Sequence, residues 1–213
     1  MPAPTLLRHD VTGRPDGLVL MLHGGRAEGL TEVDDSSASW RRSRWMMEHI
    51  RDDLDRADVA VWLLRYARRG WNDRGGREPF PVPDARWALA EARREHGDVP
   101  VVLLGHSMGG RTAVAVADDP SVVGVVALAP WLPPGEPVGT LAGRRLVAAH
   151  GRHDAITSFR QTRAFCRAAA EVAADVELVD MGRVGHYMFR RRAAWNDVAI
   201  RHCLGALGAA RAV

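Results

Sequence analysis

The sequence contains no lysine, so all 29 of its Lys or Arg positions are arginine. These arginines are interleaved with Asp and Glu, as in residues 41–58, RRSRWMMEHIRDDLDRAD, and the formal net charge is only +3. Mixed charges of this kind are typical of a solvated helix face, whereas a nucleic-acid interface shows a continuous basic stripe. The composition therefore predicts no nucleic-acid partner.

Long apolar runs and clustered cysteines are missing as well. No stretch approaches the roughly 20 continuous apolar residues of a membrane span. The N-terminal residues lack the basic and apolar segments of a signal peptide, so we expect a cytoplasmic protein with no membrane partner. Cys166 and Cys203 have no metal or redox spacing and fall on the apolar sides of predicted helices. They are expected to be buried small side chains, and no metal site is predicted.

What the sequence does contain is a regular alternation of strand-like and helix-like segments. The expected strands are residues 5–11, 18–22, 59–66, 101–104, 122–129, 145–149 and 176–180. The expected helices are residues 39–57, a segment capped by Asp84, residues 113–117 and 158–173, and about 20 residues at the C-terminus. The alternation predicts one α/β domain over residues 1–213, with a mostly parallel sheet of about seven strands and helices on both faces.

The most informative stretch is residues 101–110, VVLLGHSMGG. An apolar strand, the pattern G-x-S-x-G and a small-residue helix together are typical of a nucleophile elbow. A Cβ at Gly105 or Gly109 would collide with the neighbouring strand or helix. The context predicts Ser107 as a nucleophile in a strained backbone conformation, above a helix N-terminus that can stabilise an oxyanion. The alternative is a tight glycine turn with an idle serine.

Other reactive side chains also follow predicted strands. The loop 23–25 (His-Gly-Gly), Asp154 and His186 each come directly after a strand, as Ser107 does. In parallel sheets, ligands bind beyond the carboxyl ends of the strands. We therefore expect these four segments to converge on one edge of the sheet.

These segments resemble those of the α/β-hydrolase superfamily over nearly the whole chain. The resemblance rests on HGG at 23–25, GHSMGG at 105–110, HGRHD at 150–154 and GH at 185–186. It implies that Ser107 is the nucleophile, that His186 is the general base and that Asp154 orients the histidine. This assignment agrees with the chemistry, because a serine hydroxyl needs a base to take its proton and a histidine is suited to that role.

The resemblance also implies an oxyanion hole made of two backbone N–H groups. Met108, the residue after the nucleophile, would supply one of them. The other would come from the loop after the second strand, where Gly25 is favoured over Arg26. No metal and no organic cofactor is implied.

Two of these assignments have competitors. Asp180, at the end of the last strand, is the rival acid, and Asp154 is alternatively a cap for the helix after it. His186 is alternatively a surface loop histidine. Asp154 is preferred because it follows the preceding strand and completes the order Ser, Asp, His.

The remaining histidines are expected to have structural roles. His106 is expected to pack against a neighbouring strand and to point away from the site, given the alternation of side chains along a strand. His23 is expected to form a hydrogen bond within its own loop without titrating. His150 and His153 are interpreted as turn residues.

Two tryptophans and an arginine-rich loop follow strands on the same edge. Trp71 and Trp131 are candidate pocket residues, although they could instead fill gaps between loops and sheet. The loop before Pro79 carries arginines that could attract an anionic acyl group, although a solvated loop is favoured; they are Arg68, Arg69, Arg74 and Arg77.

The gap between residues 129 and 145 is too short for a multi-helix cap. The chain thus resembles the small cap-less members: carboxylesterases, dienelactone-hydrolase-like proteins and acyl-protein thioesterases. This implies a serine hydrolase that cleaves a small-molecule ester or thioester through an acyl-enzyme. Peptidase, lactonase and amidase activities remain open. So do a non-catalytic ligand-binding or signalling role and acyl-transfer or lyase chemistry, since fold alone does not set function.

Overall fold

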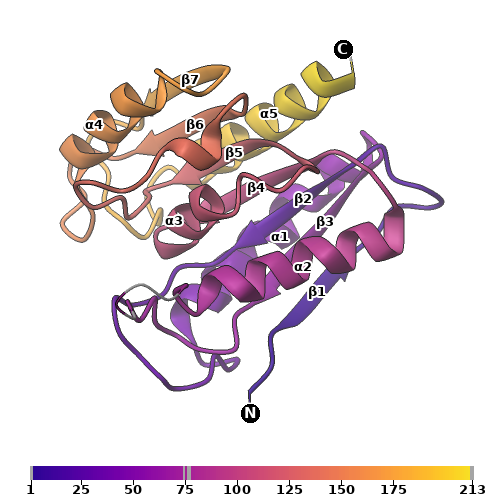
Figure 1. The fold of residues 1–213 in the computed structure, drawn as a ribbon, viewed down its shortest axis with the longest axis horizontal. Coiled ribbons are helices and arrows are strands. Elements are labelled where there is room, and N and C mark those ends of the chain that lie inside the picture. The colour runs from indigo at the N-terminus through magenta and orange to yellow at the C-terminus, as the bar shows by residue number, and fades with distance from the viewer. Residues whose placement is uncertain (1, 74, 76–77, 212–213) are drawn as a thin grey trace.

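A seven-stranded sheet runs through the computed structural model, which describes residues 2–73, 75 and 78–211 (Figure 1). The strands are β1 (Thr5–His9), β2 (Gly17–Leu22), β3 (Val59–Arg65), β4 (Val101–His106), β5 (Val122–Leu128), β6 (Arg145–His150) and β7 (Asp175–Asp180). Their order is β1-β3-β2-β4-β5-β6-β7, and only the β1–β3 pair is antiparallel. The predicted mostly parallel sheet of about seven strands is confirmed.

Helices cover both faces of this sheet. They are α1 (Ala38–Asp55), α2 (Pro81–His96), α3 (Met108–Ala115), α4 (Phe159–Ala169) and α5 (Arg192–Arg211). Helices α1 and α5 pack together on one face, and α2, α3 and α4 cover the other (Figure 1). Strands β2 and β4 are therefore buried along their full length, which explains their uninterrupted apolar sequences. The carboxyl ends of these buried strands form the edge at which the polar residues gather.

The start of α2 differs from the sequence-based expectation. Asp84 is not its N-terminal cap, because the helix begins three residues earlier, at Pro81. Proline suits the first turn of a helix, since its fixed φ is helical and its missing N–H would have no partner there. Asp84 lies within this first turn, and its Oδ2 accepts a hydrogen bond from the Ala67 N–H at 2.8 Å. It thereby ties α2 to the end of β3.

The connection between β5 and β6 holds no inserted helices. Its one regular element is a single 3-10 turn at Gly139–Leu141, so the expected absence of a cap domain follows directly from the described chain. Helix α5 is the longest helix at 20 residues. Among the described residues, no helix combines the length and the apolar character that crossing a bilayer requires.

The two cysteines lie where the apolar helix faces predict them. Cys166 on α4 and Cys203 on α5 are both buried, and neither forms a disulfide. Burial raises the pKa of the Cys166 thiol to about 11, because the thiolate is poorly solvated there. Both thiols are therefore protonated packing side chains.

Candidate active site

Ser107 lies in the sharp turn between β4 and α3. Its backbone has φ 56° and ψ −117°, a conformation that costs a non-glycine residue free energy and is found at functional sites. The two flanking glycines are sterically required. A Cβ at Gly105 would lie 2.3 Å from the Gly109 carbonyl oxygen, and one at Gly109 would lie 2.0 Å from the Leu22 carbonyl oxygen. The predicted strained elbow is confirmed.

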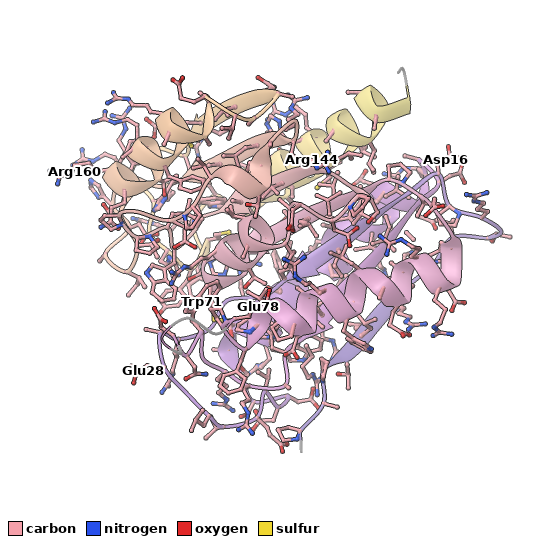
Figure 2. The ribbon with its side chains drawn as sticks, viewed as in Figure 1. Asp16, Glu28, Trp71, Glu78, Arg144 and Arg160 are labelled. Atoms are coloured by element: carbon pink, nitrogen blue, oxygen red, sulfur yellow. The ribbon has the colours of Figure 1, made fainter. Side chains whose placement is uncertain are left out.

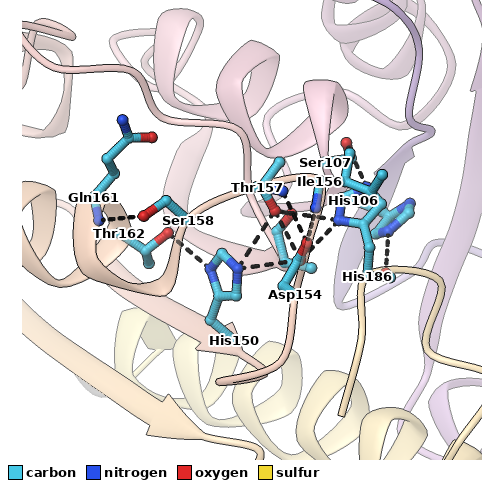
Figure 3. A network of polar contacts seen from close by, with 11 residues as sticks. His106, Ser107, His150, Asp154, Ile156, Thr157, Ser158, Gln161, Thr162 and His186 are labelled. Carbon is cyan, nitrogen blue, oxygen red and sulfur yellow. Dashed lines mark hydrogen bonds and ion pairs between the residues drawn. The ribbon is translucent and has the colours of Figure 1, made fainter.

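His186 bridges Ser107 and Asp154. The Oγ of Ser107 lies 3.0 Å from Nε2 of His186, although 79 residues separate the two in sequence. The Nδ1 of His186 lies 2.8 Å from Oδ2 of Asp154 (Figure 3). All three side chains come from loops at the carboxyl ends of β4, β6 and β7, as the strand pattern predicts.

The Asp154 carboxylate is almost fully buried and accepts several hydrogen bonds. Its Oδ1 accepts from the N–H groups of Ile156 and Thr157, both at 2.8 Å, and its Oδ2 accepts from the Thr157 hydroxyl at 2.8 Å. Desolvation raises the pKa of this carboxyl, but hydrogen bonds from His150, His186 and the two N–H groups outweigh it and hold the pKa well below its usual value. The group therefore stays ionised beside the His186 ring.

His150 is a second histidine on the same carboxylate, and its interpretation as a turn residue is wrong. It is the last residue of β6 and is completely buried. Its Nε2 lies 3.2 Å from Asp154 Oδ2, and its Nδ1 lies 2.8 Å from the Thr162 hydroxyl on α4. The available signal was its position at the end of an apolar strand, which is also where Ser107 stands relative to β4.

The rival acid lies elsewhere. Asp180 forms an ion pair with Arg152 at the surface, at 2.6 Å between Oδ2 and Nε, and among the described contacts it makes none with His186. The alternative role of Asp154 as the cap of α4 is also excluded, because the hydroxyl of Ser158 caps that helix. The acid next to the His186 ring is Asp154.

The two candidate oxyanion donors lie side by side. Met108 is the first residue of α3, where helical N–H groups have no intrahelical acceptor. A Cβ at Gly25 would lie 2.5 Å from the Met108 sulfur, so the loop and the helix start are in contact. The Arg26 N–H is already used in a 3.0 Å bond to the Arg69 carbonyl. This arrangement favours Gly25 over Arg26 as the second donor.

His23 has the structural role expected for it. Its Nδ1 donates a 2.6 Å hydrogen bond to the Gly24 carbonyl, and its Nε2 accepts from the Tyr66 N–H at 3.3 Å. Burial lowers the pKa of His23 to about 4. The ring is therefore neutral and fixes the loop that carries Gly25.

His106 does not point away from the site as expected, because its side chain lines the same cavity as Ser107. Its Nε2 donates a 3.1 Å hydrogen bond to the His186 carbonyl oxygen, and the two rings lie 5.0 Å apart. Burial, followed by the nearby His186 ring, lowers the pKa of His106 to about 3. His106 therefore supports the backbone of His186 as a neutral ring. Simple strand alternation failed here because the elbow begins at the next residue.

A cavity of about 360 Å³ opens beside Ser107. Its lining combines backbone and polar groups of the loops with three apolar side chains that are largely exposed. These are Ile156 (61% exposed), Tyr187 (54%) and Phe189 (67%). The rings of Tyr187 and Phe189 stack with their centres 5.7 Å apart. The cavity thus offers an apolar wall next to the nucleophile, and sequence reasoning did not identify these residues.

The two tryptophans proposed as pocket residues are not among those that line this cavity. Trp71 and Trp131 pack edge to face, and the Arg111 guanidinium lies 4.1 Å and 4.7 Å from their ring centres. Arg111 is also ion-paired with Glu136 at 2.7 Å. Trp71 lies inside the molecule, whereas Glu28 and Arg160 project outward (Figure 2). In this structure both tryptophans act as packing groups around α3.

The described arginines of the loop before Pro79 bind neighbouring backbone. Arg68 donates to the Leu30 carbonyl, and Arg69 donates to the Glu32 carbonyl and to Asp34. These contacts hold the segment that follows the oxyanion loop. Arg74 and Arg77 lie outside the described residues.

Comparison with known proteins agrees with this architecture. Residues 19–210 match the profile of the Alpha/beta hydrolase family. A serine hydrolase homologue from Coxiella burnetii superposes with a TM-score of 0.68 at 16% identity, covering 93% of this chain and 91% of the other. No match is found among curated protein sequences.

Two further solved structures are similar at low identity. Est1E from Butyrivibrio proteoclasticus, with ferulic acid bound, gives a TM-score of 0.67 at 12% identity, covering 96% of each chain. Esterase 2 from Thermogutta terrifontis, phosphonylated by cyclosarin, gives 0.65 at 16% identity, covering 93% of this chain and 86% of that one. At these identities the likeness establishes the fold.

Proposed function

The chain belongs to the alpha/beta hydrolase family, and from this premise we propose that it is a serine hydrolase acting on a carboxylic ester or thioester through an acyl-enzyme. One observation carries the proposal: hydrogen bonds join Ser107 to His186 and His186 to Asp154 without interruption. Nucleophile, base and orienting acid within hydrogen-bond distance of one another are the requirement for activating a serine hydroxyl.

In the first half of the reaction, Ser107 Oγ attacks the carbonyl carbon of the substrate while His186 Nε2 takes the hydroxyl proton. The resulting tetrahedral oxyanion accepts hydrogen bonds from the N–H groups of Gly25 and Met108. Each such donor contributes about 10²- to 10³-fold to turnover in related sites. The intermediate then collapses, the bond to the alcohol or thiol breaks, and His186 returns the proton to the leaving group.

In the second half, His186 takes a proton from a water molecule, whose oxygen attacks the acyl-enzyme. The acid product leaves, and Ser107 recovers its proton. Asp154 stays ionised throughout, because its hydrogen bonds hold its pKa well below the usual value. It keeps the Nδ1–H tautomer of His186 and stabilises the imidazolium that forms in each half.

The surroundings of the cavity support a small or protruding acyl group. No cap lies between β5 and β6, and the apolar wall of Tyr187 and Phe189 is largely open to solvent. The similar structures include an esterase with a bound aromatic acid and an esterase phosphonylated by an organophosphorus compound. They favour an ester or thioester over the peptidase, lactonase and acyl-transfer alternatives.

Turnover of p-nitrophenyl acetate and of short acyl thioesters tests the proposal. We expect the wild-type protein to hydrolyse at least one of these substrate classes with a pre-steady-state burst. Ser107→Ala should lower kcat by about 10⁶-fold while the circular dichroism spectrum is unchanged. A purified, folded Ser107→Ala protein that keeps more than about a tenth of the activity would reject the nucleophile role.

A further inference from the structure

Arg42 on α1 is a buried cation without an acidic partner in the described chain. Its side chain is only 8% exposed. Its Nε donates a 3.1 Å hydrogen bond to the Tyr187 carbonyl oxygen. Neither of its terminal nitrogens, Nη1 and Nη2, has a hydrogen-bond partner among the described residues. Two strong, charged donors are therefore left unused inside the protein.

Arg42 also lies beside a second cation. Its guanidinium is 4.9 Å from the centre of the Trp45 ring, and the Arg192 guanidinium is 5.3 Å from the same ring. Burial, and then the charge of Arg192, lower the pKa of Arg42 to about 10, so the group is still protonated at neutral pH. One indole face cannot supply the hydrogen bonds that two guanidinium groups require.

A buried, unpaired charge normally costs several kcal/mol and is rare in folded proteins unless an anion satisfies it. Arginine presents its donors as a planar fork that matches carboxylate and phosphate oxygens. The missing partner of Arg42 is therefore expected to be an oxyanion that is not part of this chain.

The position of Arg42 indicates which oxyanion this is. Arg42 lines the cavity beside Ser107, and it also lines a neighbouring cavity of about 360 Å³. The two cavities share Ala38, Arg42 and Phe189, so Arg42 lies at their junction. Arg41 and Arg192 add further positive charge to the second cavity. A molecule that reaches outward from Ser107 would meet these three arginines.

We propose that Arg42 binds an anionic group, a carboxylate or a phosphate, that the substrate carries at a distance from its scissile bond. The proposal rests on the function proposed above and names the substrate class for the same site. The apolar wall of Tyr187 and Phe189 contacts the part of the substrate between the two ends. Because both rings are more than half exposed, they can turn aside toward Arg42 with little loss of buried area.

Two matched substrate pairs test this assignment and separate its two sources of negative charge. Monomethyl glutarate and methyl pentanoate differ only in a terminal carboxylate. Butanoyl-CoA and the butanoyl thioester of N-acetylcysteamine differ in the phosphates of the leaving group. The measured quantity is the ratio of kcat/KM for the charged and the neutral member of each pair.

We expect the wild-type protein to prefer the charged member of one pair. Arg42→Gln should lower that ratio about 10- to 100-fold, the range for losing hydrogen bonds to a charged group. Arg42→Lys, which keeps the charge but not the fork, should retain part of the preference. Arg44→Gln is the control, because Arg44 lies exposed on the same helix, paired with Glu48 at 3.1 Å. It should leave the ratio within about twofold of wild type.

Equal loss of both members of a pair in Arg42→Gln would mean that Arg42 only supports the Tyr187 backbone, and it would overturn the proposal. So would a wild-type enzyme that prefers neither charged member. Absence of all ester and thioester turnover would instead count against the hydrolase function. In that case calorimetric binding of glutarate and of CoA still decides the role of Arg42. Weaker binding of either ligand to Arg42→Gln supports the proposal, and unchanged or undetectable binding in both proteins overturns it.

Discussion

His150 and Asp154 form a buried pair in which Nε2 lies 3.2 Å from Oδ2. The same oxygen faces Nδ1 of His186 at 2.8 Å, so one carboxylate serves two imidazole rings (Figure 3). His150 is itself fixed by the Thr162 hydroxyl at 2.8 Å. This chain of contacts connects helix α4 to the proposed base. It identifies His150 as a positioning residue that holds Asp154 in place.

Replacing His150 should therefore weaken catalysis without removing it. We expect His150→Phe to lower kcat about 10- to 100-fold with little change in KM, because it removes a hydrogen bond to a charged group. His150→Gln, whose amide can still donate, should retain more activity. Thr162→Val, which removes only the support of His150, should have the smallest effect. A folded His150→Phe protein with the kcat of wild type would contradict this role.

The choice of acid is tested by a pair of isosteric substitutions. Asp154→Asn should lower kcat by about 10⁴-fold, since an amide favours the wrong tautomer of the histidine. Asp180→Asn removes only a surface ion pair with Arg152 and should change kcat by less than about threefold. Steady-state kinetics on one ester compares the two variants. A larger loss in Asp180→Asn would reverse the assignment.

Acid should destabilise the fold through two buried histidines. Burial lowers the pKa of His23 to about 4 and that of His106 to about 3. The unfolded chain binds protons below its histidine pKa of about 6.5, while the folded chain does not. Stability is therefore complete above about pH 6.5 and is lost as pH falls toward the folded values. The limiting slope is about 1.4 kcal/mol per pH unit for each histidine.

Urea unfolding between about pH 7.5 and about pH 5 measures this slope. The His106→Asn variant serves as the control, because it removes one of the two contributions and should show a shallower dependence. A free energy of unfolding that stays constant or rises as the pH is lowered over this range would refute the explanation.

The elbow glycines give a prediction about stability. Gly109→Ala would place a Cβ 2.0 Å from the Leu22 carbonyl oxygen, which belongs to a buried strand and cannot move freely. We expect it to destabilise the fold by more than about 3 kcal/mol or to prevent folding. The matched control is Gly208→Ala on α5, where no atom lies within 4 Å of the new Cβ. There the change should stabilise the helix by up to about 1 kcal/mol, and denaturant unfolding of both variants tests the contrast.

The sheet was predictable because its strands are buried on both faces and read as continuous apolar runs. β2 and β4, for example, lie within one or two residues of the expected ranges. The grouping of Ser107, Asp154 and His186 followed from one rule, that polar residues after parallel strands meet at one edge. Neither inference needed a side-chain contact.

What escaped prediction depends on contacts between distant elements. His150 and Thr162 lie on a strand and a helix whose relative placement no local pattern encodes. Arg42 looks like one more arginine on a charged helix, and its burial became visible only once Tyr187 and Trp45 were placed around it. His106 was misassigned because strand alternation ends at the elbow. In each case tertiary packing, which the sequence pattern does not carry, decided the role.

The most direct measurement of the central claim is mass spectrometry of the protein after reaction with a fluorophosphonate. The account predicts one covalent adduct per chain, located by peptide mapping on Ser107. Labelling should be abolished in Ser107→Ala and strongly slowed in His186→Gln, because the hydroxyl is then no longer deprotonated as it attacks. An unlabelled wild-type protein, or an adduct on a residue other than Ser107, would contradict the account.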